Sequence, residues 1–173
     1  MNSHTRRVAL SEPIFDEIYN KIAQHYPNSC IIWIDQVINH TIEGRYNTLK
    51  DELNDSTELQ LFHGTSRQGV QNIIFSGFDV SFNKVSAYGK GTYFAVDPKL
   101  SLLYAPITKQ NHDAQFVILC DVLIGKTELG SSNRIPTPDV INFVNRKQDP
   151  TIYVACKNDG AIPRYVISFY TGN

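Results

Sequence analysis

The sequence contains few cysteines and lacks long apolar runs, and both absences exclude classes of protein. Cys30, Cys120 and Cys156 are the 3 cysteines among 173 residues, widely spaced and without a Cys-x-x-Cys pair. This pattern favours free thiols in a reducing compartment over disulfides or a zinc site. No segment reaches the roughly 18 apolar residues of a membrane-spanning helix, and the opening MNSHTRRVAL lacks a signal peptide's apolar run. We therefore expect an intracellular protein, cytoplasmic or nuclear, with no metal and no membrane contact.

An excess of charge of either sign is also lacking. The 16 basic residues oppose 17 acidic residues, so the formal net charge is −1, and strong attraction to nucleic acid is not predicted. Hydrophobic residues make up 42% of the chain, which is typical of a folded domain and argues against disorder. No internal repeat or flexible linker divides the chain. We expect one domain over residues 1–173, and a monomer.

Helical patterns gather in the first half of the chain and strand patterns in the second. Ser11 is a candidate N-cap for a first helix, a second helix is expected over residues 40–53, and Thr65 with Gln68 has the form of a capping box before a third helix that ends at Gly77. Strands are expected over residues 30–38, 56–65, 92–96, 115–125, 151–156 and 164–170, with a loop over residues 129–150. Because strands and helices do not alternate regularly, the class is α+β with a largely antiparallel sheet.

The segment YGKGTYFAVDPKLSLLY, residues 88–104, places two aromatic rings around a helix start. Asp97 followed by Pro98 predicts that start, and Ser101 and Tyr104 then share one helical face. With Tyr93 on the preceding strand, the two rings and the hydroxyl could form a slot for a flat, amide-bearing heteroaromatic ligand. On spacing alone, the alternative that these tyrosines are ordinary core residues stays open. The same holds for the lone histidine of LFHGTS at residues 61–66.

Several segments, taken in order, resemble the catalytic domain of the poly(ADP-ribose) polymerase-like (PARP, diphtheria-toxin-type) ADP-ribosyltransferases. They are VINHTIEGRYNTLKDEL, LFHGTS, SGF, YGKGTYFAVDPKLSLLYA, VLIG and DPTIYVACKNDGAIPRYVI, and the resemblance covers about residues 11–170. It implies a split, mostly antiparallel β-sheet with flanking helices. It also implies that the domain uses NAD+ as a co-substrate and cleaves the nicotinamide–ribose bond.

The resemblance implies roles for five of the residues already singled out. His63 would hydrogen-bond the adenosine ribose. The backbone of Gly64 and the hydroxyl of Ser101 would hold the nicotinamide carboxamide, and Tyr93 and Tyr104 would stack on either side of its ring.

Thr65 and Phe94 complete the donor-binding set that the resemblance implies, because each adjoins a residue assigned to the donor. Residues 79–88, which are polar and unpatterned, would form a loop that covers the donor. No regulatory helical domain is expected before residue 11.

The third catalytic position, after His63 and Tyr93, departs from the polymerising members of the family. They carry a glutamate where this sequence has Ile152, and isoleucine has no acceptor oxygen or charge. Loss of a positioned acid–base group typically costs about 10²–10⁴-fold, which makes processive polymer synthesis implausible. A second departure is Asp121, which we expect on an edge or outer face.

We therefore expect a mono-ADP-ribosyltransferase, a pentosyl-transferring glycosyltransferase that modifies protein side chains, most plausibly Glu or Asp. Two alternatives stay open. One is an inactive module that only binds NAD+ or ADP-ribose. The other is an enzyme that modifies phosphorylated ends of RNA or DNA.

Overall fold

A single sheet forms the centre of the computed structural model, which describes residues 4–82, 87–107 and 114–170. Its strands are β1 (His4–Arg7), β2 (Cys30–Ile38), β3 (Glu58–Gly64), β4 (Thr92–Ala95), β5 (Gln115–Leu123), β6 (Thr127–Leu129), β7 (Asn142–Val144), β8 (Ile152–Ala155) and β9 (Ala161–Tyr170). The strand order is β1-β2-β9-β5-β3-β4-β8-β7-β6. All neighbouring pairs are antiparallel except β6 and β7. The predicted α+β class with a mostly antiparallel sheet is confirmed.

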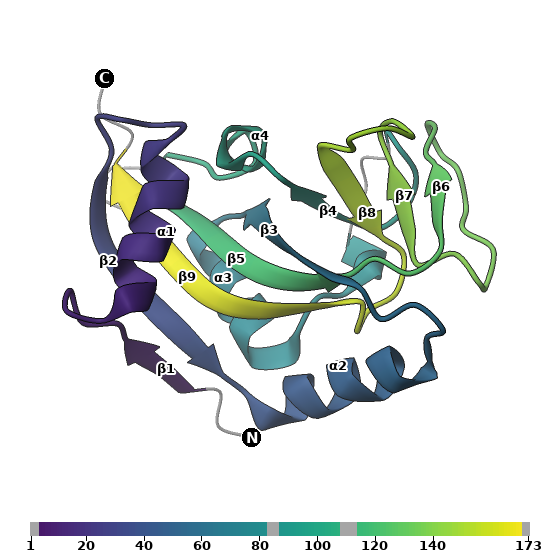
Figure 1. Ribbon diagram of the computed structural model, residues 1–173, viewed down its shortest axis with the longest axis horizontal. Coiled ribbons are helices and arrows are strands. Elements are labelled where there is room, and N and C mark those ends of the chain that lie inside the picture. The colour runs from purple at the N-terminus through teal and green to yellow at the C-terminus, as the bar shows by residue number, and fades with distance from the viewer. Residues whose placement is uncertain (1–3, 83–86, 108–113, 171–173) are drawn as a thin grey trace.

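The sheet is split between β3 and β4. Strand β3 pairs with β5 along its whole length, from Glu58 to Gly64, whereas its pairing with β4 consists of Phe62 opposite Ala95. Figure 1 shows the result: a larger half built from β1, β2, β9, β5 and β3, and a smaller half in which β4, β8, β7 and β6 lie to the right. The two halves diverge at the end of β3, where the predicted site residues begin.

Helices cover both faces of the larger half (Figure 1). They are α1 (Pro13–Ala23), α2 (His40–Glu52), α3 (Arg67–Ser76) and the short α4 (Pro98–Leu102), with a 3₁₀ turn at Val80–Phe82. Helix α1 packs Ile18 and Ile22 against β2 and β9, in one cluster with Leu102 of α4. Helix α3 packs Val70 into the cluster on the other face, which includes Ile118 of β5. Successive residues of β5 therefore pack into two hydrophobic clusters, one on each face of the sheet.

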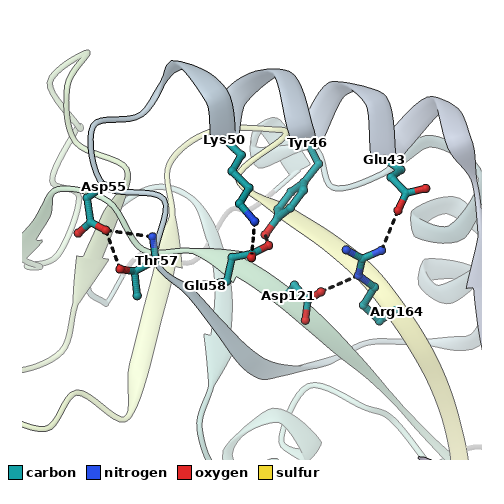
Figure 2. A network of polar contacts seen from close by, with 8 residues as sticks. All are labelled: Glu43, Tyr46, Lys50, Asp55, Thr57, Glu58, Asp121 and Arg164. Atoms are coloured by element: carbon teal, nitrogen blue, oxygen red, sulfur yellow. Dashed lines mark hydrogen bonds and ion pairs between the residues drawn. The ribbon is translucent and has the colours of Figure 1, made fainter.

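Helix α2 is attached to the sheet by a polar network (Figure 2). Arg164 of β9 donates to Asp121 of β5 over 2.6 Å and to Glu43 of α2 over 3.2 Å. The Tyr46 hydroxyl of α2 donates to Glu58 at the start of β3 over 2.5 Å. Of the two expected positions for Asp121, the sheet edge is wrong, because β5 lies between β9 and β3. The partly exposed carboxylate of Asp121 pairs with Arg164. The network fixes one end of β3, and the opposite end carries His63 and Gly64.

Both predicted helix caps in the first half of the chain are displaced by one residue. The residue at the N-cap of α1 is Glu12, not Ser11, and its carboxylate bonds the guanidinium of Arg6 and the Ala9 N–H rather than the helix. The N-cap of α3 is Ser66, not Thr65, and its Oγ accepts from the Gly69 N–H over 3.1 Å. Thr65 and Ser66 are adjacent hydroxyl residues that can compete for the same cap, so the sequence pattern left the choice for α3 ambiguous.

Three strands lie where the sequence predicted none. Strand β1 is a short charged edge strand, HTRR, without the apolar alternation of a strand pattern. Strands β6 and β7 each have three residues and lie within or at the border of the predicted loop over residues 129–150. Strand β9 also begins at Ala161 rather than at residue 164. Strands this short give too little periodicity to be recognised.

Candidate functional site

One cavity of about 300 Å³ brings together all the residues assigned to the site from the sequence. They are His63, Gly64, Thr65, Tyr93, Phe94, Ser101, Tyr104 and Ile152. The cavity lies at the split of the sheet, with walls from the ends of β3, β4 and β8 and from α4. Sequence reasoning missed other lining residues, among them Tyr88 and Leu100. The signal for Leu100 was available, since it lies on α4, four residues before Tyr104.

A second, larger cavity of about 970 Å³ continues from the first. It shares His63, Thr65 and Phe82 with the smaller cavity and extends along α3 to Gly77. Residues 83–86, at the centre of the loop predicted to cover the donor, lie outside the described residues. Two adjoining compartments with a histidine between them suit an elongated ligand made of two linked parts.

His63 is held as a neutral imidazole with a defined orientation. Its Nδ1 lies 2.9 Å from the backbone carbonyl oxygen of Tyr93, and its ring packs edge-on against Phe78 with centroids 5.2 Å apart. Burial lowers the pKa of His63 below 6.5, and the Tyr93 carbonyl opposes this shift only in part. Because a carbonyl can only accept, Nδ1 carries the proton and Nε2 is left as an acceptor. His63 can therefore accept a hydrogen bond from a ligand hydroxyl.

The ring of Tyr93 is fixed by its own hydroxyl. That hydroxyl donates to the Gly89 carbonyl over 2.8 Å and accepts from the Tyr88 N–H over 3.0 Å. Gly89 has φ +113°, and a Cβ there would lie 2.3 Å from the ring of Phe143, so only glycine fits this turn. Burial raises the pKa of the Tyr93 phenol, which keeps it protonated for these bonds. The result is one rigid aromatic wall for the smaller cavity.

Helix α4 is pressed against the end of β3. Asp97 caps the helix by accepting from the Lys99 N–H over 2.7 Å, as the sequence predicted. The Ser101 hydroxyl, only 4% exposed, donates to the Phe62 carbonyl over 2.8 Å. A Cβ on Gly64 would lie 1.7 Å from the Ser101 carbonyl oxygen, so this approach requires glycine. With its proton given to Phe62, the Ser101 oxygen can still accept from an amide N–H of a ligand.

Tyr104 and Phe94 differ sharply in how open they are to a ligand. The Tyr104 side chain follows α4 at the cavity rim and is 60% exposed, so a flat ligand could still bury its ring. Phe94 is 1% exposed, and its ring lies in the core, with centroids 5.5 Å from His63 and 5.1 Å from Phe78. Phe94 therefore acts on any ligand through the position of His63.

Ile152 occupies the first position of β8, opposite Ala95 of β4. The Asn145 side-chain oxygen accepts from the Thr151 and Ile152 N–H groups, each over 3.1 Å, and so fixes the entry to this strand. The Ile152 side chain is partly buried against the cluster that contains Phe143. Among the described residues that line the smaller cavity, none is an aspartate or glutamate.

The described ranges contain no arrangement typical of a metal site or of a membrane-spanning helix. No group of three or more His, Cys, Asp or Glu side chains there is arranged to hold a metal ion. None of the helices in that part of the chain has the length and apolar character needed to cross a membrane.

The mostly antiparallel split sheet with flanking helices is consistent with the fold of an ADP-ribosyltransferase catalytic domain. Residues 14–164 match the family model of the poly(ADP-ribose) polymerase catalytic domain, and the chain belongs to this family. The resemblance recognised in the sequence is thereby confirmed.

Three relatives have names that specify the type of transfer. The chain is 28% identical over 175 residues to human "Protein mono-ADP-ribosyltransferase PARP12", covering 92% of the chain and 24% of the relative. It is 30% identical over 174 residues to human "Protein mono-ADP-ribosyltransferase PARP14", covering 89% and 10%. It is 30% identical over 155 residues to mouse "Protein mono-ADP-ribosyltransferase PARP10", covering 80% and 16%. The chain thus spans at most 24% of the length of these three relatives.

Proposed function

We propose that the chain is an NAD+-dependent mono-ADP-ribosyltransferase that transfers one ADP-ribose unit to glutamate or aspartate side chains of proteins and releases nicotinamide. The observation that carries the proposal is the composition of the smaller cavity. It combines a rigid Tyr93 ring, an open Tyr104 ring and the Gly64 backbone with Ile152 in place of an acid.

The two compartments divide the donor between them. The nicotinamide ring lies between Tyr93 and Tyr104, where offset stacking contributes about 0.5–1.5 kcal/mol beyond burial. Its carboxamide pairs with the Gly64 backbone and with the Ser101 oxygen. His63 accepts from a hydroxyl of the adenosine ribose through Nε2, and the adenosine extends into the larger cavity. Holding both ends of the donor orients the bond that breaks.

The reaction with a carboxylate acceptor needs no base. The bond between the ribose C1′ and the nicotinamide nitrogen breaks, and its electron pair neutralises the pyridinium, which leaves as nicotinamide. A carboxylate oxygen of the acceptor then bonds to C1′ and forms an ester. The acceptor is already deprotonated and its charge stabilises the positive ribose, so Ile152 does not prevent the step.

Polymer growth has a different requirement. The acceptor is then a ribose hydroxyl, which must lose a proton as it attacks. Among the lining residues that the structure describes there is no carboxylate to take that proton. The absence of a positioned base typically costs about 10²–10⁴-fold. The three relatives described above are each named a mono-ADP-ribosyltransferase, which supports the same restriction to single units.

The test is incubation with labelled NAD+, with nicotinamide release and the labelled products measured in parallel. We expect nicotinamide release together with single-unit products on protein, which hydroxylamine removes because they are esters. Ladders of long polymer would contradict the proposal. Calorimetric binding of NAD+ without nicotinamide release would identify a binding module instead. Transfer to 5′-phosphorylated RNA but not to dephosphorylated RNA or protein would move the acceptor to nucleic-acid ends.

A further inference from the structure

Tyr88 is a third tyrosine of the smaller cavity, and the donor set described above gives its side chain no role. It lies five residues before Tyr93 of β4 and lines the cavity. Its side chain packs against the same cluster as Tyr93 and Ile152, which includes Phe143 and Val154. Tyr88 therefore belongs to the wall of the cavity in which Ile152 replaces an acid.

The hydroxyl of Tyr88 has no hydrogen-bond partner within residues 4–82, 87–107 and 114–170. Two neighbouring hydroxyls of the cavity are already engaged: that of Tyr93 by the Gly89 carbonyl and that of Ser101 by the Phe62 carbonyl. The Tyr88 side chain is only partly exposed, and half-buried phenols usually find a partner. Because Tyr88 lines the cavity and its hydroxyl has no partner in that part of the chain, the phenol is available to a polar group of a ligand.

The backbone of Tyr88 also ties its position to the nicotinamide slot. Its N–H donates to the Tyr93 hydroxyl, so the segment that carries Tyr88 is anchored to the ring that forms one wall. Tyr88, Tyr93 and Tyr104 all line the smaller cavity, so the three tyrosines border one space. The part of NAD+ next to the nicotinamide ring is its ribose, which carries two hydroxyls.

We propose that the Tyr88 hydroxyl hydrogen-bonds a hydroxyl of the nicotinamide-side ribose of NAD+ and so orients this sugar, for which Ile152 offers no polar atom. The inference rests on the proposed function. A neutral phenol can donate and accept but is a poor base, so it positions the ribose without activating a hydroxyl acceptor. Orientation of the donor and restriction to single units then come from the same wall.

The test is the variant Tyr88→Phe, which removes the hydroxyl and keeps the ring. NAD+ affinity, measured by calorimetry, should fall about 3- to 10-fold, the effect of one lost hydrogen bond. The affinity for free nicotinamide should not change, because the ring slot is intact. The KM for NAD+ should rise while kcat stays within about twofold of the wild-type value. A neutral contact that is present throughout the reaction stabilises substrate and transition state alike. Tyr19→Phe, a partly exposed tyrosine of α1 away from both cavities, is the matched control.

Analogues of NAD+ identify the bond directly. The two analogues lack either the 2′- or the 3′-hydroxyl of the nicotinamide-side ribose. Wild type and Tyr88→Phe should bind equally to the one analogue that lacks the hydroxyl contacted by Tyr88. If the wild type transfers ADP-ribose and Tyr88→Phe binds NAD+ with unchanged affinity, the inference is overturned and the proposed function stands. An equal loss for NAD+ and nicotinamide would also overturn it, because Tyr88 would then only support the slot. Failure of the wild-type protein to bind NAD+ would instead refute the proposed function itself.

Discussion

The imidazole of His63 and the backbone carbonyl of Tyr93 are joined by a hydrogen bond of 2.9 Å that crosses the split in the sheet. His63 lies on β3 and Tyr93 on β4, whose strands share only one register pair, Phe62 with Ala95. The same residue, Tyr93, therefore provides a ring to the smaller cavity and sets the tautomer of the histidine that borders both cavities. Loss of either partner should disturb both parts of the donor site.

Removal of the histidine ring should abolish transfer. His63→Ala deletes the acceptor that we propose for the adenosine ribose and leaves the Tyr93 carbonyl without its donor. Because the ring also packs on Phe78 and Phe94, we expect a stability loss of about 0.5–3 kcal/mol with the fold retained. Transfer assays with far-UV circular dichroism on the same sample check both points. Retained transfer in a folded variant would mean that the site is misplaced.

The stability of the protein should depend on pH through His63. Burial holds the pKa of His63 in the folded protein below 6.5, the ordinary value that applies to the unfolded chain. Between these two values the unfolded chain binds more protons, so the free energy of unfolding falls as the pH drops below 6.5 and His63 adds no dependence above it. Chemical denaturation of wild type and His63→Gln from about pH 5 to about pH 8 isolates this contribution. A wild-type curve that parallels the variant would contradict it.

Two glycine substitutions should act in opposite directions. In Gly64→Ala the new methyl group would lie 1.7 Å from the Ser101 carbonyl oxygen, so α4 must move away from β3. We expect a loss of at least about 1–3 kcal/mol in the free energy of unfolding, and loss of NAD+ binding. Gly44→Ala, in the middle of α2, meets nothing within 4 Å and should stabilise by up to about 1 kcal/mol. Denaturant melts of both variants measure the contrast; equal effects would refute the close approach of α4.

An acid at the third catalytic position should alter acceptor use without creating a polymerase. Ile152→Glu places a carboxylate at the cavity wall, where it can orient a ribose hydroxyl, but the surface that must hold a growing chain is unchanged. Ile152→Gln is the matched uncharged control. Gel analysis of labelled products should show single units for all three proteins, with acceptors shifted in Ile152→Glu alone. Long polymers from Ile152→Glu would show that the missing acid was the only barrier.

Local chemistry was enough to predict the parts of the site that depend on adjacent residues. Asp97 and Pro98 combine a cap with a proline suited to the first turn, and α4 begins there. The bond from Ser101 to Phe62 joins residues 39 positions apart, and no local pattern encodes it. The same is true of the hydrogen bonds between Asn145 and the start of β8, which set the position of Ile152.

The residues proposed to bind the donor in the smaller cavity were assigned from the family resemblance rather than from periodicity. Spacing alone did not distinguish Tyr93 and Tyr104 from core tyrosines, because exposure depends on how the two halves of the sheet diverge. Tyr88 was missed for a related reason: it lies at the end of a segment predicted to be a loop, and its packing against the cluster of Val140, Phe143, Val154 and Cys156 joins residues distant in sequence.

Mass spectrometry of the intact protein and its peptides after incubation with NAD+ tests the central claim most directly. The account predicts adducts of one ADP-ribose unit on glutamate or aspartate side chains, with equivalent nicotinamide release, and no adduct in His63→Ala. Several ADP-ribose units linked in series on one side chain, or an unmodified protein with no nicotinamide released, would contradict it.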